Sequence, residues 1–265
     1  MKKVLLFSVF ALSAVLTAQS NIPAGTVIPV MLNTSVDAKS ARVGQTLTAK
    51  IEQDVPLYNG AYDTAKIKAG TRVIGEVLAI TAAGNSQPAT ITLRFDKVDV
   101  AGHMMPVLTD LRALASPLEV DQAQTEISEQ DWGSTPPWSQ TLTQIGGDVV
   151  YRETGKVYYG SETVGRSVYA GGWGVLSQVS SSPRNGCRGA IDGNNNPQAL
   201  WVFSHNACGV YGYDAVITDA GRTNPEGRIV LASKNGDLKL RSGSALLLRV
   251  NGSGNHPAQS DVASQ

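Results

Sequence analysis

Short runs of alternating apolar and polar residues, separated by glycine, proline and asparagine, run through the first part of the chain. Residues 90–96, Thr-Ile-Thr-Leu-Arg-Phe-Asp, put every second side chain on one face, as in a half-buried strand. Similar patterns predict strands at residues 27–32, 46–51, 72–81, 89–100 and 103–108, and again at 228–233, 237–240 and 245–250. Asp99, Ala101 and Gly102 mark a tight hairpin between residues 100 and 103. Short strands at this spacing are typical of an antiparallel β-barrel or sandwich.

One local pattern occurs three times, in residues 22–28, 67–73 and 240–246. Each copy has an apolar residue, two turn residues, a glycine, a hydroxyl residue and then a predicted strand. The glycines are Gly25, Gly70 and Gly243, which adopt positive φ without steric cost. Because the pattern returns near residue 243, we expect the last strands to complete a sheet that begins near Ile22.

Shifts of composition divide the chain. Residues 22–115 read as the first part of a β domain and residues 226–251 as its closing strands. An acidic, proline-containing linker is expected at residues 116–143, with a short surface helix at about 120–129. Residues 144–225, rich in glycine and aromatic residues, read as an inserted module that is separable from the domain around it, and residues 252–265 as a disordered tail.

Composition and charge exclude several classes of protein. Of the 265 residues, 17% are charged and 27 are glycine, which disfavours a helical bundle. Basic and acidic residues balance at 22 each, so no field of one sign exists to hold a nucleic acid backbone.

The N-terminus carries an export signal. Lys2 and Lys3 precede an apolar run that ends near Leu16, with small residues up to Ala18, as in a cleavable signal peptide at residues 1–18. A membrane anchor is the alternative, but this run is shorter than the roughly 20 apolar residues that span a bilayer. We therefore expect a periplasmic or secreted protein with no integral span after cleavage.

The two cysteines, Cys187 and Cys208, are expected to form a disulfide in that oxidising compartment. Closing this loop is worth roughly 3 kcal/mol in the chain-entropy model. A reactive thiol or a metal pair is the rival interpretation, for which His205 is the one nearby second ligand.

The stretches IPAGTVIPVMLNTSVDAKSARVGQTLTAKIEQDV and IKAGTRVIGEV resemble the C-terminal β-barrel domain of the TrbI-like scaffold proteins of conjugation and type IV secretion. The matching positions are residues 22–34, 44–55 and 67–75. The resemblance implies a barrel fold and an envelope compartment, with function carried by what the inserted module binds. This chain departs from the family in having a cleavable signal where the family has a transmembrane helix, and a Gly- and Tyr-rich insertion where the family has a helical antenna.

No catalytic constellation, metal site or cofactor motif is predicted. His205 has no Gly-x-Ser-x-Gly elbow to act upon, and the calcium-loop-like Asp192-Gly-Asn-Asn-Asn has Pro197 where a glycine is needed. The aromatic residues Tyr158, Tyr159, Trp173, Trp201 and Tyr211 are instead a possible binding surface, or the core of a small β module. The sequence therefore favours a non-enzymatic structural or binding protein, a scaffold or adaptor, with envelope proteins or glycan as partners and oligomer formation possible. A glycan-directed binding protein or hydrolase is the alternative.

Overall fold

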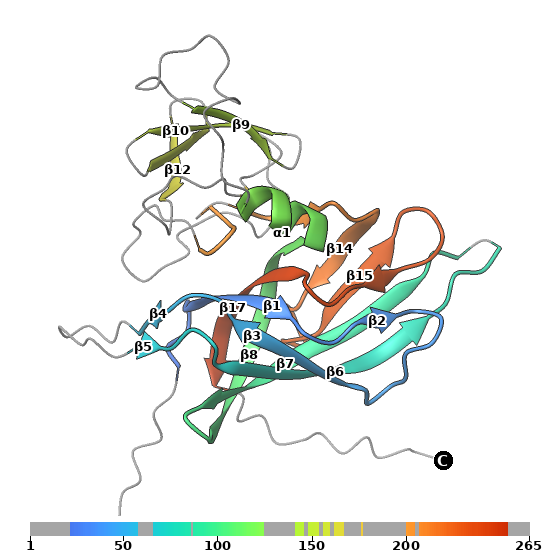
Figure 1. Cartoon of the computed structure of the whole chain (residues 1–265). Helices are drawn as coiled ribbons and strands as arrows, with labels where there is room; N and C mark the ends of the chain where they lie inside the picture. Colours follow the sequence, from blue (N-terminus) through green and yellow to red (C-terminus); the bar gives the residue numbers. More distant parts are fainter. Residues whose placement is uncertain are drawn as a thin grey trace, which may run out of the picture.

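A closed antiparallel β-barrel of six strands forms the body of the protein in the computed structural model (Figure 1). The structure describes residues 22–57, 66–85 and 87–124, the backbone of four strands between 141 and 166, residue 176, and residues 200–204 and 207–253. Around the barrel the order is β8-β17-β1-β3-β6-β7, and β7 pairs again with β8. The sequence predicted a mostly β, antiparallel barrel or sandwich, and of these two the structure shows the barrel. Its strands are β1 (Val27–Leu32), β3 (Thr46–Ile51), β6 (Arg72–Thr81), β7 (Thr90–Val100), β8 (His103–Ala115) and β17 (Ala245–Ser253).

Three further strands extend this sheet where β7 and β8 separate: β13 (Gly209–Tyr211), β14 (Ala215–Ala220) and β15 (Ile229–Ser233). Near their shared hairpin β7 and β8 are paired, but residues 90–93 of β7 pair with β15, and residues 113–115 of β8 pair with β13. We call the line along which β7 and β8 part the seam. There the Thr109 hydroxyl donates a hydrogen bond to the Phe95 carbonyl at 2.8 Å, so one contact across the seam is made by a side chain.

Smaller sheets complete the architecture. β2 (Val36–Asp37) pairs with β16 (Lys239–Leu240), and β4 (Val55–Pro56) pairs with β5 (Lys66–Ile67), at opposite ends of the barrel (Figure 1). A separate four-stranded sheet has the order β12-β11-β10-β9, from β9 (Thr141–Ile145), β10 (Asp148–Glu153), β11 (Lys156–Tyr159) and β12 (Glu162–Arg166). Within the described part of the chain, no helix has the length and apolar character needed to cross a bilayer.

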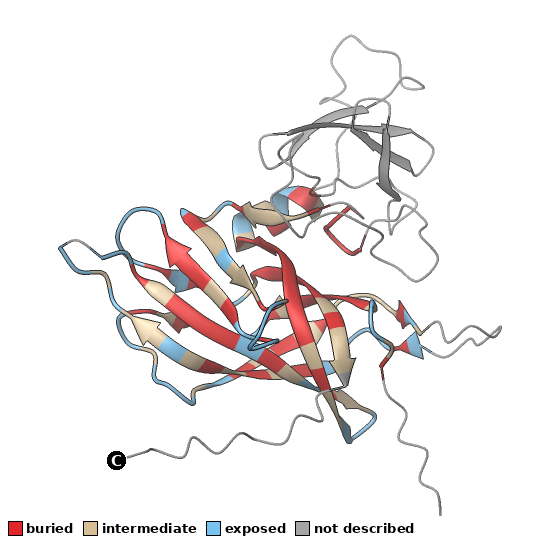
Figure 2. Ribbon diagram, turned by 180° about the vertical axis from the view of Figure 1, so that it is seen from behind, coloured by how far each residue is buried: buried red, intermediate tan, exposed pale blue. Residues whose placement is uncertain are grey.

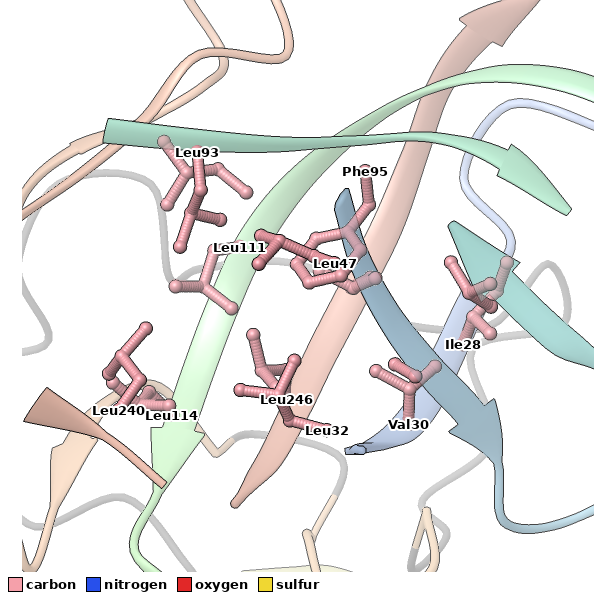
Figure 3. Close-up of a cluster of buried hydrophobic side chains, with 14 of the residues drawn as sticks. Ile28, Val30, Leu32, Leu47, Leu93, Phe95, Leu111, Leu114, Leu240 and Leu246 are labelled. Carbon is pink, nitrogen blue, oxygen red and sulfur yellow. The ribbon is translucent and has the colours of Figure 1, made fainter. Parts of the chain in front are cut away.

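Apolar side chains fill the barrel interior. Figure 3 shows residues of β1, β3, β7, β8 and β17 that point toward one another, with Leu240 beside them. Ile28, Val30 and Leu47 are fully buried, and Phe95 is 1% exposed. Barrel diameter falls with the number of strands, and side chains fill the interior of small barrels, as they do here.

The repeated glycine pattern forms the same turn at each copy. Gly25, Gly70 and Gly243 have φ of 88°, 87° and 86°. Each glycine N–H donates to a carbonyl of a neighbouring strand or strand end, on Val250, Ile51 and Leu32 respectively. These turns lead into β1, β6 and β17, which explains the pattern as a local solution for starting a barrel strand.

A second apolar cluster lies on the outer face of β1, β8 and β17, covered by α1 (Pro117–Gln124). Figure 2 shows buried residues on α1 as well as in the barrel. The helix starts and ends earlier than expected, and it is not simply a surface element, because Val120 is 5% and Ala123 1% exposed. Their two positions on one side of a short helix gave too weak a periodicity to reveal this buried face.

Several boundaries differ from those expected. Residues 209–220 form β13 and β14 of the main sheet, although the expected module extends through residue 225. The last strand reaches Ser253, two residues into the expected tail. The expected signal peptide at residues 1–18 and the tail beyond residue 253 lie outside the described residues.

Candidate functional site at the insertion junction

The chain leaves the barrel and returns to it at adjacent strands. Residues 125–208, which we call the insertion, connect α1 to β13. Gly209 lies opposite Ala113 and Tyr211 opposite Ala115 in a parallel pairing. The N–H of Ser116 then donates to the Tyr211 carbonyl at 3.0 Å. The end of β8, which precedes α1 and the insertion, and β13, which follows the insertion, are thus hydrogen-bonded neighbours.

Close packing fixes α1 against the returning strand. Gly212 has φ of 67°, and a Cβ there would lie 2.4 Å from the Ser116 hydroxyl and 2.5 Å from Cγ of Glu119. Only glycine fits this approach. Because Ser116 also accepts the Val120 N–H at 3.0 Å, the first turn of α1 is tied to the same point.

A tyrosine joins the returning segment to the last barrel strand. The Tyr213 hydroxyl lies 2.6 Å from the Ser244 hydroxyl and accepts the Arg241 N–H at 3.1 Å. Ser244 is fully buried and donates to the Arg241 carbonyl at 2.5 Å. The turn after β13 is therefore anchored to the turn that leads into β17.

Part of the insertion packs against the outer surface of the barrel. Leu176 and Leu200–Ser204, which we call the clasp, are buried, and all of them except Ser204 belong to the second apolar cluster. Leu176 and Phe203 form an isolated bridge, and the Ser204 hydroxyl donates to the Leu176 carbonyl at 2.9 Å. The backbone N–H of Trp201 donates to the side-chain oxygen of Gln53, which lies just beyond β3. Phe203 packs on Tyr211 of β13, with ring centroids 6.4 Å apart. The clasp and the junction together hold the insertion to the barrel at two places.

The aromatic residues proposed as a binding surface occupy different environments. Trp201 is 6% exposed and Tyr211 1% exposed, and both belong to the second apolar cluster. Both side chains thus pack against barrel residues on the outer face of β1, β8 and β17. Tyr158 and Tyr159 lie on β11, with Tyr158 opposite Tyr151 of β10. Trp173 lies outside the described residues.

The predicted disulfide remains a prediction. Cys208 is partly exposed and immediately precedes β13. Cys187 lies outside the described residues. Their pairing would place a cross-link within two residues of the junction.

A charged group that the sequence did not reveal lies next to the second apolar cluster. Asp110 on β8 pairs in register with Arg249 on β17, beside the Ala113–Leu247 pair of that cluster. Asp110 is fully buried, and its Oδ2 atom lies 2.6 Å from Arg249 Nη2 and 3.3 Å from Arg222 Nε. We call these three residues the Asp110 cluster. Asp110 and Arg249 are 139 positions apart, so only the folded barrel brings them together.

The ends of the barrel carry exposed ion pairs. Beside β5, a hydrogen bond from Lys66, with help from the Ala69 N–H, lowers the pKa of Asp54. The Lys39 N–H, together with Lys239, lowers the pKa of Asp37 on β2. No group of three or more potential metal ligands is found in the ranges that the structure describes.

In comparisons with known proteins, no protein-family model matches the chain, and no curated protein matches its sequence significantly.

Proposed function

We propose that this protein is a non-enzymatic binding or scaffold component of the cell envelope, in which the barrel presents the insertion to a partner. The observation that carries the proposal is the direct pairing of β13 with β8, because neighbouring ends let a sheet accept an inserted segment without disturbing its own closure. The clasp supports the same role, since it restrains how the insertion is presented.

The structure of the barrel supports a role as the platform for an insertion that binds the partner. Its interior is apolar and filled by side chains, so it offers a stable platform. Function in such a protein is carried by what is attached to the fold. Residues 125–208 supply the largest attachment, with four strands of their own.

Export and a relation to secretion or conjugation machinery are part of the proposal. The signal peptide pattern, the two cysteines and the TrbI-like stretches motivate it, and the observed barrel is compatible with such a domain. In that compartment we expect the Cys187–Cys208 disulfide to stabilise the returning end of the insertion.

The test removes the four-stranded sheet and keeps its anchor. Replacing residues 141–166 with a short Gly/Ser linker retains α1, the clasp and the barrel, so we expect cooperative unfolding to persist. Affinity capture from envelope extracts, with quantitative mass spectrometry, should show partners enriched by the full chain and lost with this variant. A matched control replaces residues 58–65, between β4 and β5, with the same linker and should capture the same partners.

Two outcomes would change the interpretation. Equal capture by the full chain and the 141–166 replacement would refute presentation by the insertion. Co-sedimentation with purified peptidoglycan, lost in the same variant and present without any protein partner, would favour the glycan-directed alternative, for which Tyr158 and Tyr159 on β11 are the remaining described candidates.

A further inference from the structure

We propose that Arg222 and Arg249 form a binding site for an oxyanion, a carboxylate or phosphate group, on the outer face of the barrel beside the insertion. The site uses residues outside the four-stranded sheet. A test of anion binding is therefore independent of the test of the proposed function.

The two guanidinium groups converge from different elements on one atom. Arg249 reaches Asp110 Oδ2 through Nη2 at 2.6 Å and Nε at 3.0 Å from β17. Arg222 approaches the same oxygen to 3.3 Å from the loop between β14 and β15. The other oxygen, Oδ1, is buried and has no hydrogen-bond partner among the described residues.

The charges of the Asp110 cluster do not cancel. Two guanidinium groups surround one carboxylate, which leaves one positive charge in excess. Within the described chain, neither arginine lies within ion-pair distance of a second carboxylate. Asp219, three positions before Arg222 in the sequence, instead lies 3.7 Å from Arg228 and accepts the Gly221 N–H at 2.9 Å. Arg112, also buried on β8, makes an interaction of its own and is not counted here. A single arginine would neutralise Asp110, so the second creates a partly buried excess charge that a bound anion would offset.

The two arginines pair with a buried carboxylate, while their own side chains remain partly exposed to solvent. Asp110 is fully buried, whereas the side chains of Arg222 and Arg249 are 19% and 24% exposed. Guanidinium groups carry several N–H donors in a fixed plane, and those not used by Asp110 are suited to two oxygens of one anion. Partial burial strengthens such an interaction relative to one in bulk water.

The loop that carries Arg222 is held in place. The Gly227 N–H donates to the Gly221 carbonyl at 2.8 Å, and the Asn251 side-chain amide of β17 donates to the same carbonyl at 3.3 Å. A Cβ at Gly227 would lie 3.3 Å from Leu108 of β8, so this part of the loop rests on the barrel. Holding the donors in advance of binding reduces the ordering cost of binding an anion.

The experiment measures anion binding by the full chain. Isothermal titration with inorganic phosphate, and separately with acetate, at constant ionic strength should give saturable binding to the wild type, and the stronger of the two identifies the preferred group. We expect at least a tenfold loss of affinity in Arg222→Gln, which leaves the Asp110–Arg249 pair in place. Arg94→Gln is the matched control, because Arg94 is a surface arginine that also contacts two carboxylates, those of Glu76 and Asp96.

Three results would overturn the proposal. One is the absence of saturable binding of either anion to the wild type, which needs no variant. Another is equal loss of affinity in Arg94→Gln. The third is a lower thermal midpoint of Arg222→Gln with unchanged anion affinity, which would make the Asp110 cluster a structural ion pair only.

Discussion

At the scale of the residue, Gly75 of β6 is the described glycine with the least room for a side chain. A Cβ at this position would lie 2.1 Å from the Arg94 carbonyl oxygen and 2.9 Å from the Phe95 ring. Because the first contact is with backbone, β6 and β7 would have to move apart. We expect Gly75→Ala to reduce the free energy of unfolding by at least about 2 kcal/mol, in the range of overpacked cores. Gly84→Ala is the control, since nothing lies within 4 Å of a Cβ there. Chemical denaturation of both variants measures the difference, and equal stability would contradict it.

The Asp110 cluster makes a second prediction at this scale. Asp110→Asn leaves two arginines beside a neutral, buried side chain. We expect it to lower the free energy of unfolding by about 3 kcal/mol, as when a buried ion pair is broken. Asp237→Asn removes the partner of Lys39 in an exposed pair and should cost less than about 1 kcal/mol. Urea denaturation at pH 7 compares them, and a similar, small loss in both would show that Arg222 and Arg249 do not depend on Asp110.

Single residues also show which environments could be predicted from the sequence and which could not. Gly25, Gly70 and Gly243 were identifiable because each turn is specified by four or five consecutive residues. Asp110 instead lies beyond the predicted end of its strand at residue 108. It contacts Arg222 and Arg249, which are more than 100 positions away in the chain, and no local pattern encodes these contacts.

At the scale of the element, strands with an alternating pattern were predicted well. β3 and β6 have the predicted bounds, because the alternation marks both ends of each strand. β1 also has the predicted bounds although both of its faces are covered, because the glycine turn at Gly25 marks its start. β8 continues to Ala115 rather than Leu108, since beyond residue 108 both of its faces are covered and the alternation disappears. β13 and β14 were assigned to the insertion because their composition resembles it.

The β4–β5 hairpin should respond to pH through Asp54. Its pKa is lowered in the folded protein, so its contribution to stability is present above the unfolded value of about 3.9 and is lost as the pH falls through the folded value. We expect Asp54→Asn to lower the thermal midpoint at pH 7, with a gap from wild type that narrows as the pH falls below about 4. Thermal melts from pH 7 to 2.5 measure the gap. A gap that is constant over this range would mean that charge plays no part.

The clasp should open separately from the barrel. Trp201→Ala removes a large buried side chain from the second apolar cluster and leaves the barrel core intact. We expect faster hydrogen exchange at the Leu176 and Ser204 amides, which bond to the Val202 and Leu176 carbonyls, and little change at the Val250 amide, which bonds to Thr26. Phe95→Ala, in the barrel core, should instead speed exchange at all three. Equal acceleration at all three amides in Trp201→Ala would show that the two clusters open together.

At the scale of the whole molecule, the barrel and the insertion are connected less simply than the shifts of composition suggested. The sequence indicated where the chain changes character, near residue 116, because charged and proline-rich residues replace the alternating pattern. It did not indicate that the clasp returns to the barrel surface, since Leu176 and residues 200–204 carry no pattern of their own. A deletion of residues 144–225 would therefore remove β13 and β14 from the main sheet, together with half of the residues of the second apolar cluster.

The position of β17 has a consequence for how the chain acquires its structure. This strand, the last of those that the structure describes, lies between β1, the first of them, and β8. Contacts such as that between Ser35 and Ser242 span 207 positions, so the ring closes only after nearly all of the chain has been synthesised. Until then β1 and β8 present unpaired edges, and such distant pairing is slow to form and exposed to aggregation. We expect a chain that stops at residue 243 to show no cooperative unfolding and to aggregate, and to be rescued by a separate peptide of residues 244–253. Circular dichroism and light scattering, with and without the peptide, measure this, and a soluble, cooperatively folded truncated chain would contradict it.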